Sequence, residues 1–168
     1  FRSPGAESCR LAVTQSRGLG RVLTEYFSAR PELVDSVPSG NIRISGCPNG
    51  CGQHHIGALG FQGSVRKVAG KAVPQYFVLV GGGVTNEGAH FGKVVAKIPA
   101  RRIADAAGRL VELYRAQRES ASEDLGAFYR RIAPSVAAEW LKDLVEHQTA
   151  FAGRADQLVY LLQRADVR

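Results

Sequence analysis

One short loop, residues 44–55, constrains this chain more than any other stretch. It holds two thiols, Cys47 and Cys51, in a C-x3-C spacing, together with a proline, three glycines and two histidines. Glycines let a backbone approach a bulky ligand closely, and thiolates are soft ligands that suit iron–sulfur clusters, zinc or copper(I). Because this composition is poor material for a packed core, we interpret the loop as the cradle of a cofactor.

The third cysteine, Cys9, lies 38 residues before Cys47. Structural zinc sites usually combine two C-x2-C or C-x4-C pairs, so zinc is a weaker interpretation of a single C-x3-C pair. Free cysteines are also common in protein cores, which leaves inert thiols as an alternative. Three cysteines cannot all pair, and no signal peptide is visible. These observations favour a reducing, cytoplasmic compartment and metal or redox chemistry over a disulfide framework.

The chain has 168 residues, enough for one domain with a substantial core. No apolar run approaches the roughly 20 residues that a membrane-spanning helix needs, so we expect no membrane contact. The chain begins at Phe1 and contains no methionine. We therefore expect a fragment, a processed chain or a trimmed one.

Positive charge is concentrated in the part of the chain that carries the cysteines. Residues 1–100 hold 11 Lys and Arg against 5 Asp and Glu, whereas residues 101–168 hold 11 against 10. This excess predicts an anionic ligand near the cysteines. The basic residues are scattered and aromatic residues are few, so the sequence argues against nucleic acid as that ligand.

The first two thirds of the chain alternate between helical and strand-like patterns. Apolar residues at helical spacing begin near residue 8, and the polar first turn is either a solvated helix start or an anion-binding helix N-terminus. The glycines at 81–83 lack the spacing of a phosphate-binding loop, and we expect them to pack against a flat cofactor or another backbone. Strands are expected at residues 41–45, 58–68, 75–80 and 91–98, with a hairpin turn at 69–71.

Beyond residue 100 the pattern is helical. Ser122 is a candidate N-cap, and Pro134 fits the first turn of a later helix. Helices are expected at residues 103–114, 123–132, 134–145 and 155–164. The fold class is therefore α+β, with a mixed or antiparallel sheet, flanking helices and a helical C-terminal tail. Residues 1–99 would form the cofactor-binding core, and residues 100–168 a helical part packed on the same domain.

Two segments resemble the cluster motifs of the sirohaem-dependent nitrite and sulfite reductases. Residues 3–19 are similar to the first motif of this family and residues 46–57 to the second. Residues 59–63, 76–80 and 97–100 also look like the family. Two motifs in the right order, covering with their surroundings roughly three quarters of the chain, are a more specific signal than either motif alone. The resemblance implies the fold of the family's 4Fe-4S domain.

The resemblance also implies a [4Fe-4S] cluster, with Cys9, Cys47 and Cys51 among its ligands. The first motif of the family is C-x5-C, and the position of its first cysteine is Ser3 in this chain. A serine alkoxide can ligate iron, but a hydroxyl loses its proton less readily than a thiol, whose reference pKa is about 8.5. Three thiolates with Ser3, water or no fourth ligand would hold a labile or three-iron cluster.

By the same resemblance, Cys51 would bridge the cluster to the iron of sirohaem. Such a pair of cofactors serves the six-electron reduction of nitrite to ammonia or of sulfite to sulfide, with ferredoxin or a flavoprotein as electron donor. Further residues implied at the cofactors are Asn49, Gln53, His54, Arg10 and Arg17. His54 and His55 would mainly hydrogen-bond to groups behind the ligands, and Arg43 is a further candidate for the carboxylates of sirohaem. His90 and His147 look like surface residues.

The reductases of this family are far longer than this chain, which looks like their cluster-bearing C-terminal portion. We therefore expect an N-terminal portion or another subunit to complete the site, and we expect the isolated chain to be inactive. The alternative is a cluster-free or interaction domain that keeps the fold after losing the first cysteine. A zinc-stabilised or nucleic-acid-binding module is a third, weaker hypothesis.

Overall fold

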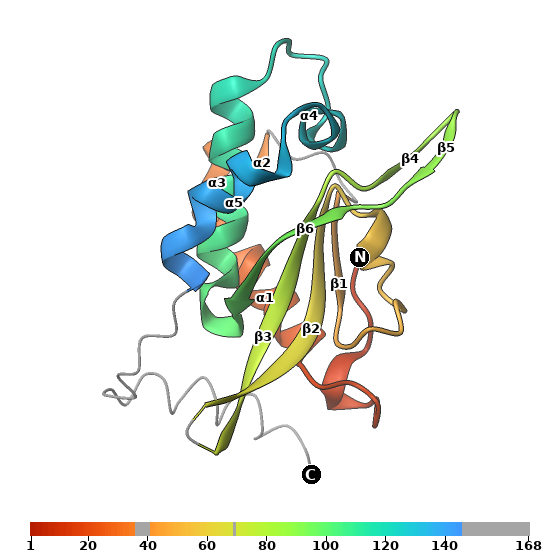
Figure 1. Cartoon of the computed structure of the whole chain (residues 1–168), viewed down its shortest axis with the longest axis vertical. Helices are drawn as coiled ribbons and strands as arrows, with labels where there is room; N and C mark the ends of the chain where they lie inside the picture. The colour runs from red at the N-terminus through yellow and green to blue at the C-terminus, as the bar shows by residue number, and fades with distance from the viewer. Residues whose placement is uncertain (36–40, 69, 146–168) are drawn as a thin grey trace.

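The computed structural model describes residues 1–35, 41–68 and 70–145 (Figure 1). A four-stranded sheet has the order β1 (Ile42–Ser45), β2 (Leu59–Val68), β3 (Lys71–Val80) and β6 (Lys93–Pro99). β1 is parallel to β2, and the other neighbours are antiparallel. The predicted mixed sheet of an α+β fold is confirmed.

The helices α1 (Ser16–Ser28), α3 (Ile103–Gln117) and α5 (Pro134–Val145) lie together on one side of the sheet (Figure 1). Register places Phe61 beside Val78 and Leu59 beside Val80 on the face that joins the core. Each of these four side chains is at most 2% exposed. The helices supply the rest of the core, including Ile103, Leu110, Leu113, Leu125 and Leu141.

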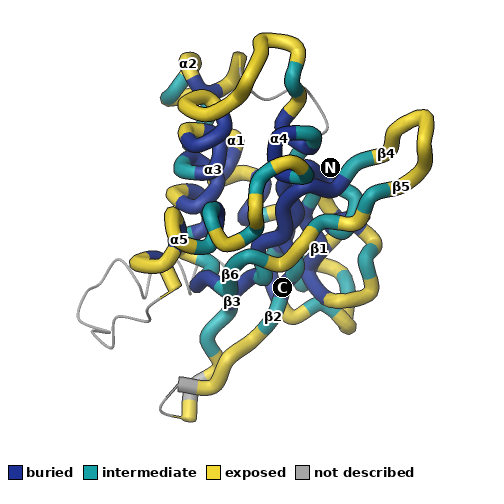
Figure 2. Tube along the Cα trace, turned by 45° about the horizontal axis from the view of Figure 1, so that its top comes forward, coloured by how far each residue is buried: buried dark blue, intermediate teal, exposed yellow. Residues whose placement is uncertain are grey.

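One short helix and one hairpin also belong to the described part of the fold. α2 (Pro31–Val34) follows α1, and the strands β4 (Gly83–Thr85) and β5 (Gly88–His90) form a hairpin that projects from the sheet. Figure 2 shows that burial concentrates where sheet and helices meet, whereas the tip of the hairpin is exposed. The sequence did not predict this hairpin. β6 starts at Lys93 rather than at residue 91.

The glycines that end β3 pack against other backbone segments. A Cβ at Gly82 would lie 2.4 Å from the carbonyl oxygen of Gly57, and Gly81 has φ +84° against the backbone of Tyr129. The expectation of a glycine bend against another backbone is confirmed. At this bend the chain leaves β3 and enters the β4–β5 hairpin, while the bend itself stays packed against the loop before β2.

The prediction of a helix from residue 8 is wrong. A 3-10 turn, η1 (Gly5–Glu7), is followed by irregular chain, and α1 starts only at Ser16. Leu11, which we expected on the apolar helix face, is exposed. The cause is the loss of helical hydrogen bonds, because the N–H groups of Val13 and Thr14 both donate to the carbonyl of Gly46.

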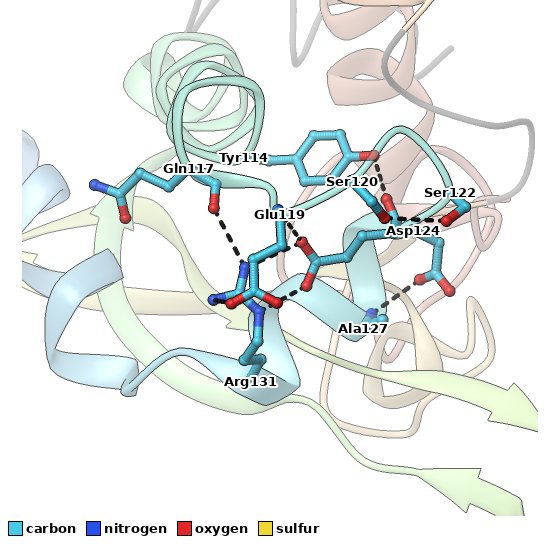
Figure 3. Close-up of polar contacts among 9 residues, drawn as sticks. Tyr114, Gln117, Glu119, Ser120, Ser122, Asp124, Ala127 and Arg131 are labelled. Atoms are coloured by element: carbon cyan, nitrogen blue, oxygen red, sulfur yellow. Dashed lines mark hydrogen bonds and ion pairs between the residues drawn. The ribbon is translucent and has the colours of Figure 1, made fainter.

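The helix α4 (Leu125–Arg131) buries Leu125, Phe128 and Tyr129 as expected, but it begins two residues later than predicted. Its N-cap is Asp124, whose Oδ1 accepts the N–H of Ala127 at 2.9 Å. Ser122, the predicted N-cap, is instead 3.0 Å from the hydroxyl of Ser120. A carboxylate at this position also suits the positive end of the helix. Figure 3 shows both contacts.

The connector between α3 and α4 is fixed by a polar network (Figure 3). Arg131 Nε is 2.7 Å from Glu123 Oε1, and Arg131 Nη2 donates to the carbonyl of Gln117. Tyr114 donates its hydroxyl to the carbonyl of Glu123 at 2.6 Å. These contacts connect the C-terminal end of α3 to α4, the helix whose Tyr129 packs against Gly81.

The helix expected at residues 155–164, and His147, lie outside the described residues. Pro134 begins α5, as the sequence predicted. Within residues 1–35, 41–68 and 70–145, no helix is long and apolar enough to cross a membrane.

Candidate metal centre

The loop with Cys47 and Cys51 closes tightly over the end of β1. The N–H of Gly52 donates to Ser45 Oγ at 3.0 Å, and the N–H of Gln53 donates to the carbonyl of Gly50 at 2.6 Å. A Cβ at Gly52 would lie only 1.9 Å from the carbonyl oxygen of Ile44. Glycine is therefore required here, and the two thiols are held at the ends of a compact turn.

His54 supports this turn from below. It is 4% exposed, with Nδ1 2.9 Å from Ser45 Oγ and Nε2 3.0 Å from Gln62 Oε1. Burial lowers the pKa of His54, and the neighbouring His55 acts in the same direction. Both ring nitrogens therefore have protein partners, and a neutral imidazole links the turn to β1 and β2.

The segment that carries Cys9 packs directly against this turn. Val13 and Thr14 donate their N–H groups to the carbonyl of Gly46 at 2.9 and 3.1 Å, and Thr14 Oγ1 donates to the same oxygen. Tyr76 hydrogen-bonds to the side chain of Thr14, and burial raises the pKa of this phenol. Two cysteine loops far apart in the sequence are therefore joined at one carbonyl group, directly before Cys47.

The three cysteines are free thiols in different environments: Cys9 is partly buried, Cys47 is buried and Cys51 is exposed. The carbonyl of Cys9 accepts the N–H of Ala12, which fixes the turn around it. Throughout the described part of the chain, no three or more His, Cys, Asp or Glu side chains gather as they would around one metal ion. A cluster is several atoms wide and takes thiolate ligands at its separate irons. Three soft donors on two joined loops fit such a group. At Ser3, the remaining position of the motif, the side chain is a hydroxyl and not a thiol.

Ser3 lies beside the end of β1 and is buried. Its N–H donates to the carbonyl of Ile44 at 2.9 Å, and its Oγ accepts the N–H of Gly46 at 3.1 Å. The structure therefore places the fourth position of the motif next to the second cysteine loop. Its hydroxyl, however, is already hydrogen-bonded to Ser16 and to the N–H of Gly46.

The other residues expected near the cofactors lie around the rim of the two loops. Arg43 Nη1 donates to Gln53 Oε1 at 2.5 Å, and Gln53 has a left-handed φ of 53°. Arg17 is 3.8 Å from the carboxylate of Glu7. Arg10 and Asn49 are exposed, as is Gln53. The ring of His55 packs edge-on against Phe91, with centroids 5.4 Å apart.

Sequence reasoning missed the residues that support the turn from behind. Ser45 and Ser16 are at most 1% exposed, and Thr14 is 3% exposed. Hydroxyl residues at the end of a strand or just before a helix are ordinary in loops, so their composition gave no signal. The one available hint was the polar stretch before α1, which we assigned to a helix start.

The family described as the nitrite and sulphite reductase 4Fe-4S domain matches residues 2–149. This chain belongs to that family. The resemblance inferred from the two cysteine motifs is therefore confirmed over most of the chain, which includes both loops.

Two relatives are nitrite reductases. The assimilatory ferredoxin-dependent nitrite reductase of Haloferax mediterranei is 26% identical over 140 residues, which cover 83% of this chain and 24% of that protein. The chloroplastic ferredoxin–nitrite reductase of Oryza sativa subsp. japonica is 31% identical over 123 residues, covering 71% of this chain and 20% of that protein. This chain therefore spans about a quarter or less of the length of these relatives.

A solved structure supports the fold. The Mycobacterium tuberculosis NirA protein superimposes with a TM-score of 0.71 at 24% identity, covering 82% of this chain and 26% of that one. At this identity the likeness is one of fold.

Proposed function

We propose that this chain is the cluster-bearing part of a reductase for nitrite or sulfite, and that Cys9, Cys47 and Cys51 ligate a [4Fe-4S] cluster. One observation carries the proposal beyond family membership. The Cys9 segment and the Cys47–Cys51 turn are bonded to each other through the carbonyl of Gly46. This bonding holds the two cysteine-bearing segments together, and it supports assigning their three soft donors to one cofactor.

The three thiols would have different tasks. Cys47 is 6% exposed at the end of β1 and suits a ligand on the inner side of the cluster. Cys51 is exposed, so its thiolate is the one able to reach a second cofactor and to bridge to sirohaem. When bound, the pair of cofactors supplies single electrons for a six-electron reduction.

The remaining residues of the site would hold and screen these ligands. Ser45 and His54 keep the turn closed. Arg10 and Arg43 would bind the carboxylates of sirohaem, and Arg17 would join them by exchanging Glu7 for a cofactor carboxylate. Asn49 and Gln53 stand on the exposed side of the same turn.

The names of the relatives favour nitrite as the substrate and ferredoxin as the donor over sulfite and a flavoprotein. Because the chain spans about a quarter or less of those proteins, the remaining substrate pocket would come from another portion or another subunit. We expect the isolated chain to bind the cluster without sustaining nitrite reduction. The free thiols suit the cytoplasm.

The test is anaerobic purification, reconstitution with iron and sulfide, and a visible spectrum with iron and sulfide analysis. The proposal expects broad absorption near about 400 nm with near-equal iron and sulfide, and sharper haem bands after sirohaem is added. Cys47→Ser should lose this absorption. A protein that stays colourless after reconstitution would contradict the proposal, and steady nitrite turnover by the isolated chain would contradict its incompleteness.

A second candidate is a domain that keeps the fold without a cluster. Ser3 favours it, because a hydroxyl stands where the family motif has its first thiol. In that case the reconstituted protein binds no stoichiometric iron, and Cys47→Ser leaves its visible spectrum unchanged.

A further inference from the structure

We propose that the hydroxyl of Ser3 joins the two cysteine loops through hydrogen bonds (the Ser3 clasp) and does not ligate iron. One iron of the cluster is then open to a small external donor such as water, a thiol or an imidazole. This inference rests on the proposed cluster. It adds a ligand-exchange site that a cluster held by four thiolates lacks.

The number of thiols sets the first limit. A [4Fe-4S] cluster is ordinarily held by four cysteine thiolates, and the whole chain contains three cysteines. With Cys9, Cys47 and Cys51 each on one iron, no cysteine of this chain is left for the last iron. Ser3 is the residue that the motif places there.

The hydrogen bonds of Ser3 can be assigned completely. Ser16 Oγ is 2.8 Å from the carbonyl of Ser3 and donates its only proton there. In the 3.1 Å contact between the two hydroxyls, Ser3 must therefore be the donor and Ser16 the acceptor. Ser3 Oγ also accepts the N–H of Gly46. The hydroxyl of Ser3 thus gives its proton to α1 and its lone pair to the turn that precedes Cys47.

Binding of iron by Ser3 would break these contacts. An alkoxide has no proton for Ser16, and an Oγ turned toward iron would leave the buried N–H of Gly46 without its partner. A buried polar group left without a partner destabilises the folded protein. His54 could likewise ligate iron only by breaking hydrogen bonds, because its ring nitrogens are engaged by Ser45 and Gln62. The clasp and the ligand are therefore alternative roles for Ser3, and the structure shows the clasp.

The experiment compares the reconstituted chain with Ser3→Ala, Ser3→Cys and Ser16→Ala. Ser16→Ala is the matched control, because it removes the same hydroxyl contact without changing position 3. For each protein we would measure iron and sulfide per chain, the thermal midpoint of the apo-protein, and the EPR spectrum after one equivalent of ferricyanide. The open iron should leave as Fe²⁺ while ferricyanide accepts one electron, which converts [4Fe-4S]²⁺ to [3Fe-4S]⁺.

We expect the unaltered chain and Ser3→Ala to lose one iron to ferricyanide and to give the [3Fe-4S] signal, whereas Ser3→Cys keeps its iron. Ser3→Ala and Ser16→Ala should lower the thermal midpoint of the apo-protein to a similar degree. The inference is overturned if Ser3→Ala loses the cluster while Ser16→Ala keeps it, or if the unaltered chain keeps all its iron. Absence of a cluster in every variant, Ser3→Cys included, would instead remove the proposed function and this inference with it.

A second measurement does not require the alanine variants to fold. Added 2-mercaptoethanol should shift the EPR signal of the reduced cluster in the unaltered chain, because the open iron takes up the thiol. The signal of Ser3→Cys should not change. Equal responses of the two proteins would contradict an open iron in the unaltered chain.

Discussion

The two cysteine-bearing segments are held in place by different means. The turn around Cys47 and Cys51 is held by close backbone packing, with a Cβ at Gly52 excluded by the carbonyl of Ile44. The segment around Cys9 is held by buried hydroxyls, chiefly those of Ser3 and Thr14. Glycine packing involves residues close in sequence and can be recognised from the glycine pattern. The hydroxyl contacts join residues that are far apart in the sequence, so no local pattern indicates them. This difference explains why only the second segment was predicted in shape.

The largest effect should come from Gly52→Ala. The new methyl group would lie 1.9 Å from the carbonyl oxygen of Ile44, which belongs to a paired strand and cannot move aside. We expect a loss of about 3 kcal/mol or more in the free energy of unfolding, measured by urea denaturation. Gly18→Ala is the control: its methyl group meets only ordinary contacts with Gln15 and Arg21 at the start of α1, and it should stabilise the helix by about 0.5–1 kcal/mol. Equal effects of the two substitutions would refute the role of backbone packing.

Thr14→Val tests the hydroxyl packing of the first segment. It keeps the shape of the side chain but removes the donor to Gly46 and the partner of Tyr76. We expect a loss of about 1–3 kcal/mol in the free energy of unfolding, because buried polar groups are left unsatisfied. Thr24→Val removes an exposed hydroxyl that bonds within α1 and should change stability by less than about 0.5 kcal/mol. If both variants behave alike, buried hydroxyls are not what holds the first segment.

The pH dependence of stability should report on the second loop through His54. Its pKa in the folded state is lowered by burial, whereas in the unfolded chain it is near about 6.5. As the pH falls through about 6.5, the unfolded chain takes up this proton before the folded chain does. Stability therefore decreases until the lower, folded-state pKa is reached.

Urea denaturation at several pH values measures this slope. His54→Gln should flatten it, and His90→Gln, in the β4–β5 hairpin, should leave it nearly unchanged. An unchanged slope in His54→Gln would show that His54 does not stay neutral in the folded protein.

The smallest effect should come from Glu7→Gln in the first segment. Glu7 is 3.4 Å from Arg21 and 3.8 Å from Arg17, whose side chains are largely in solvent. Exposed ion pairs contribute about 0–1 kcal/mol and weaken in salt. We expect a small decrease in thermal midpoint at low salt that disappears at high salt. A large decrease that persists in salt would mean that charge, and not the hydroxyls, fixes this segment.

Much of the fold followed from local patterns in the sequence. Segments rich in Val and Phe predicted β2 and the later part of β3, which begins at Lys71 rather than at residue 75, and Pro134 predicted the start of α5. The errors arose where distant groups compete for backbone hydrogen bonds. Gly46 takes the N–H groups of Val13 and Thr14 away from any helix, and no local signal reveals a partner more than 30 residues along the chain.

The candidate thiols could be named from the sequence, but the residues that support their loops could not. The C-x3-C spacing and the glycines identified Cys47 and Cys51, and the family motif added Cys9 and drew attention to Ser3. Spacing cannot assign the partners or the direction of a hydrogen bond, so the contacts of Ser3 with Ser16 and Gly46 are evident only in the folded structure. The buried position of His54 between β1 and β2 likewise depends on the register of the sheet.

The most direct test of the joined loops is the iron and sulfide bound per chain after anaerobic reconstitution, in the unaltered protein and in Cys9→Ser. Because we infer that both loops hold one cluster, the unaltered chain should bind iron and sulfide in near-equal amounts and Cys9→Ser should lose most of both. Circular dichroism of the two apo-proteins should be the same, which would exclude unfolding as the cause. If Cys9→Ser binds as much iron and sulfide as the unaltered chain, or if the unaltered chain binds none, the two loops do not form one cluster site.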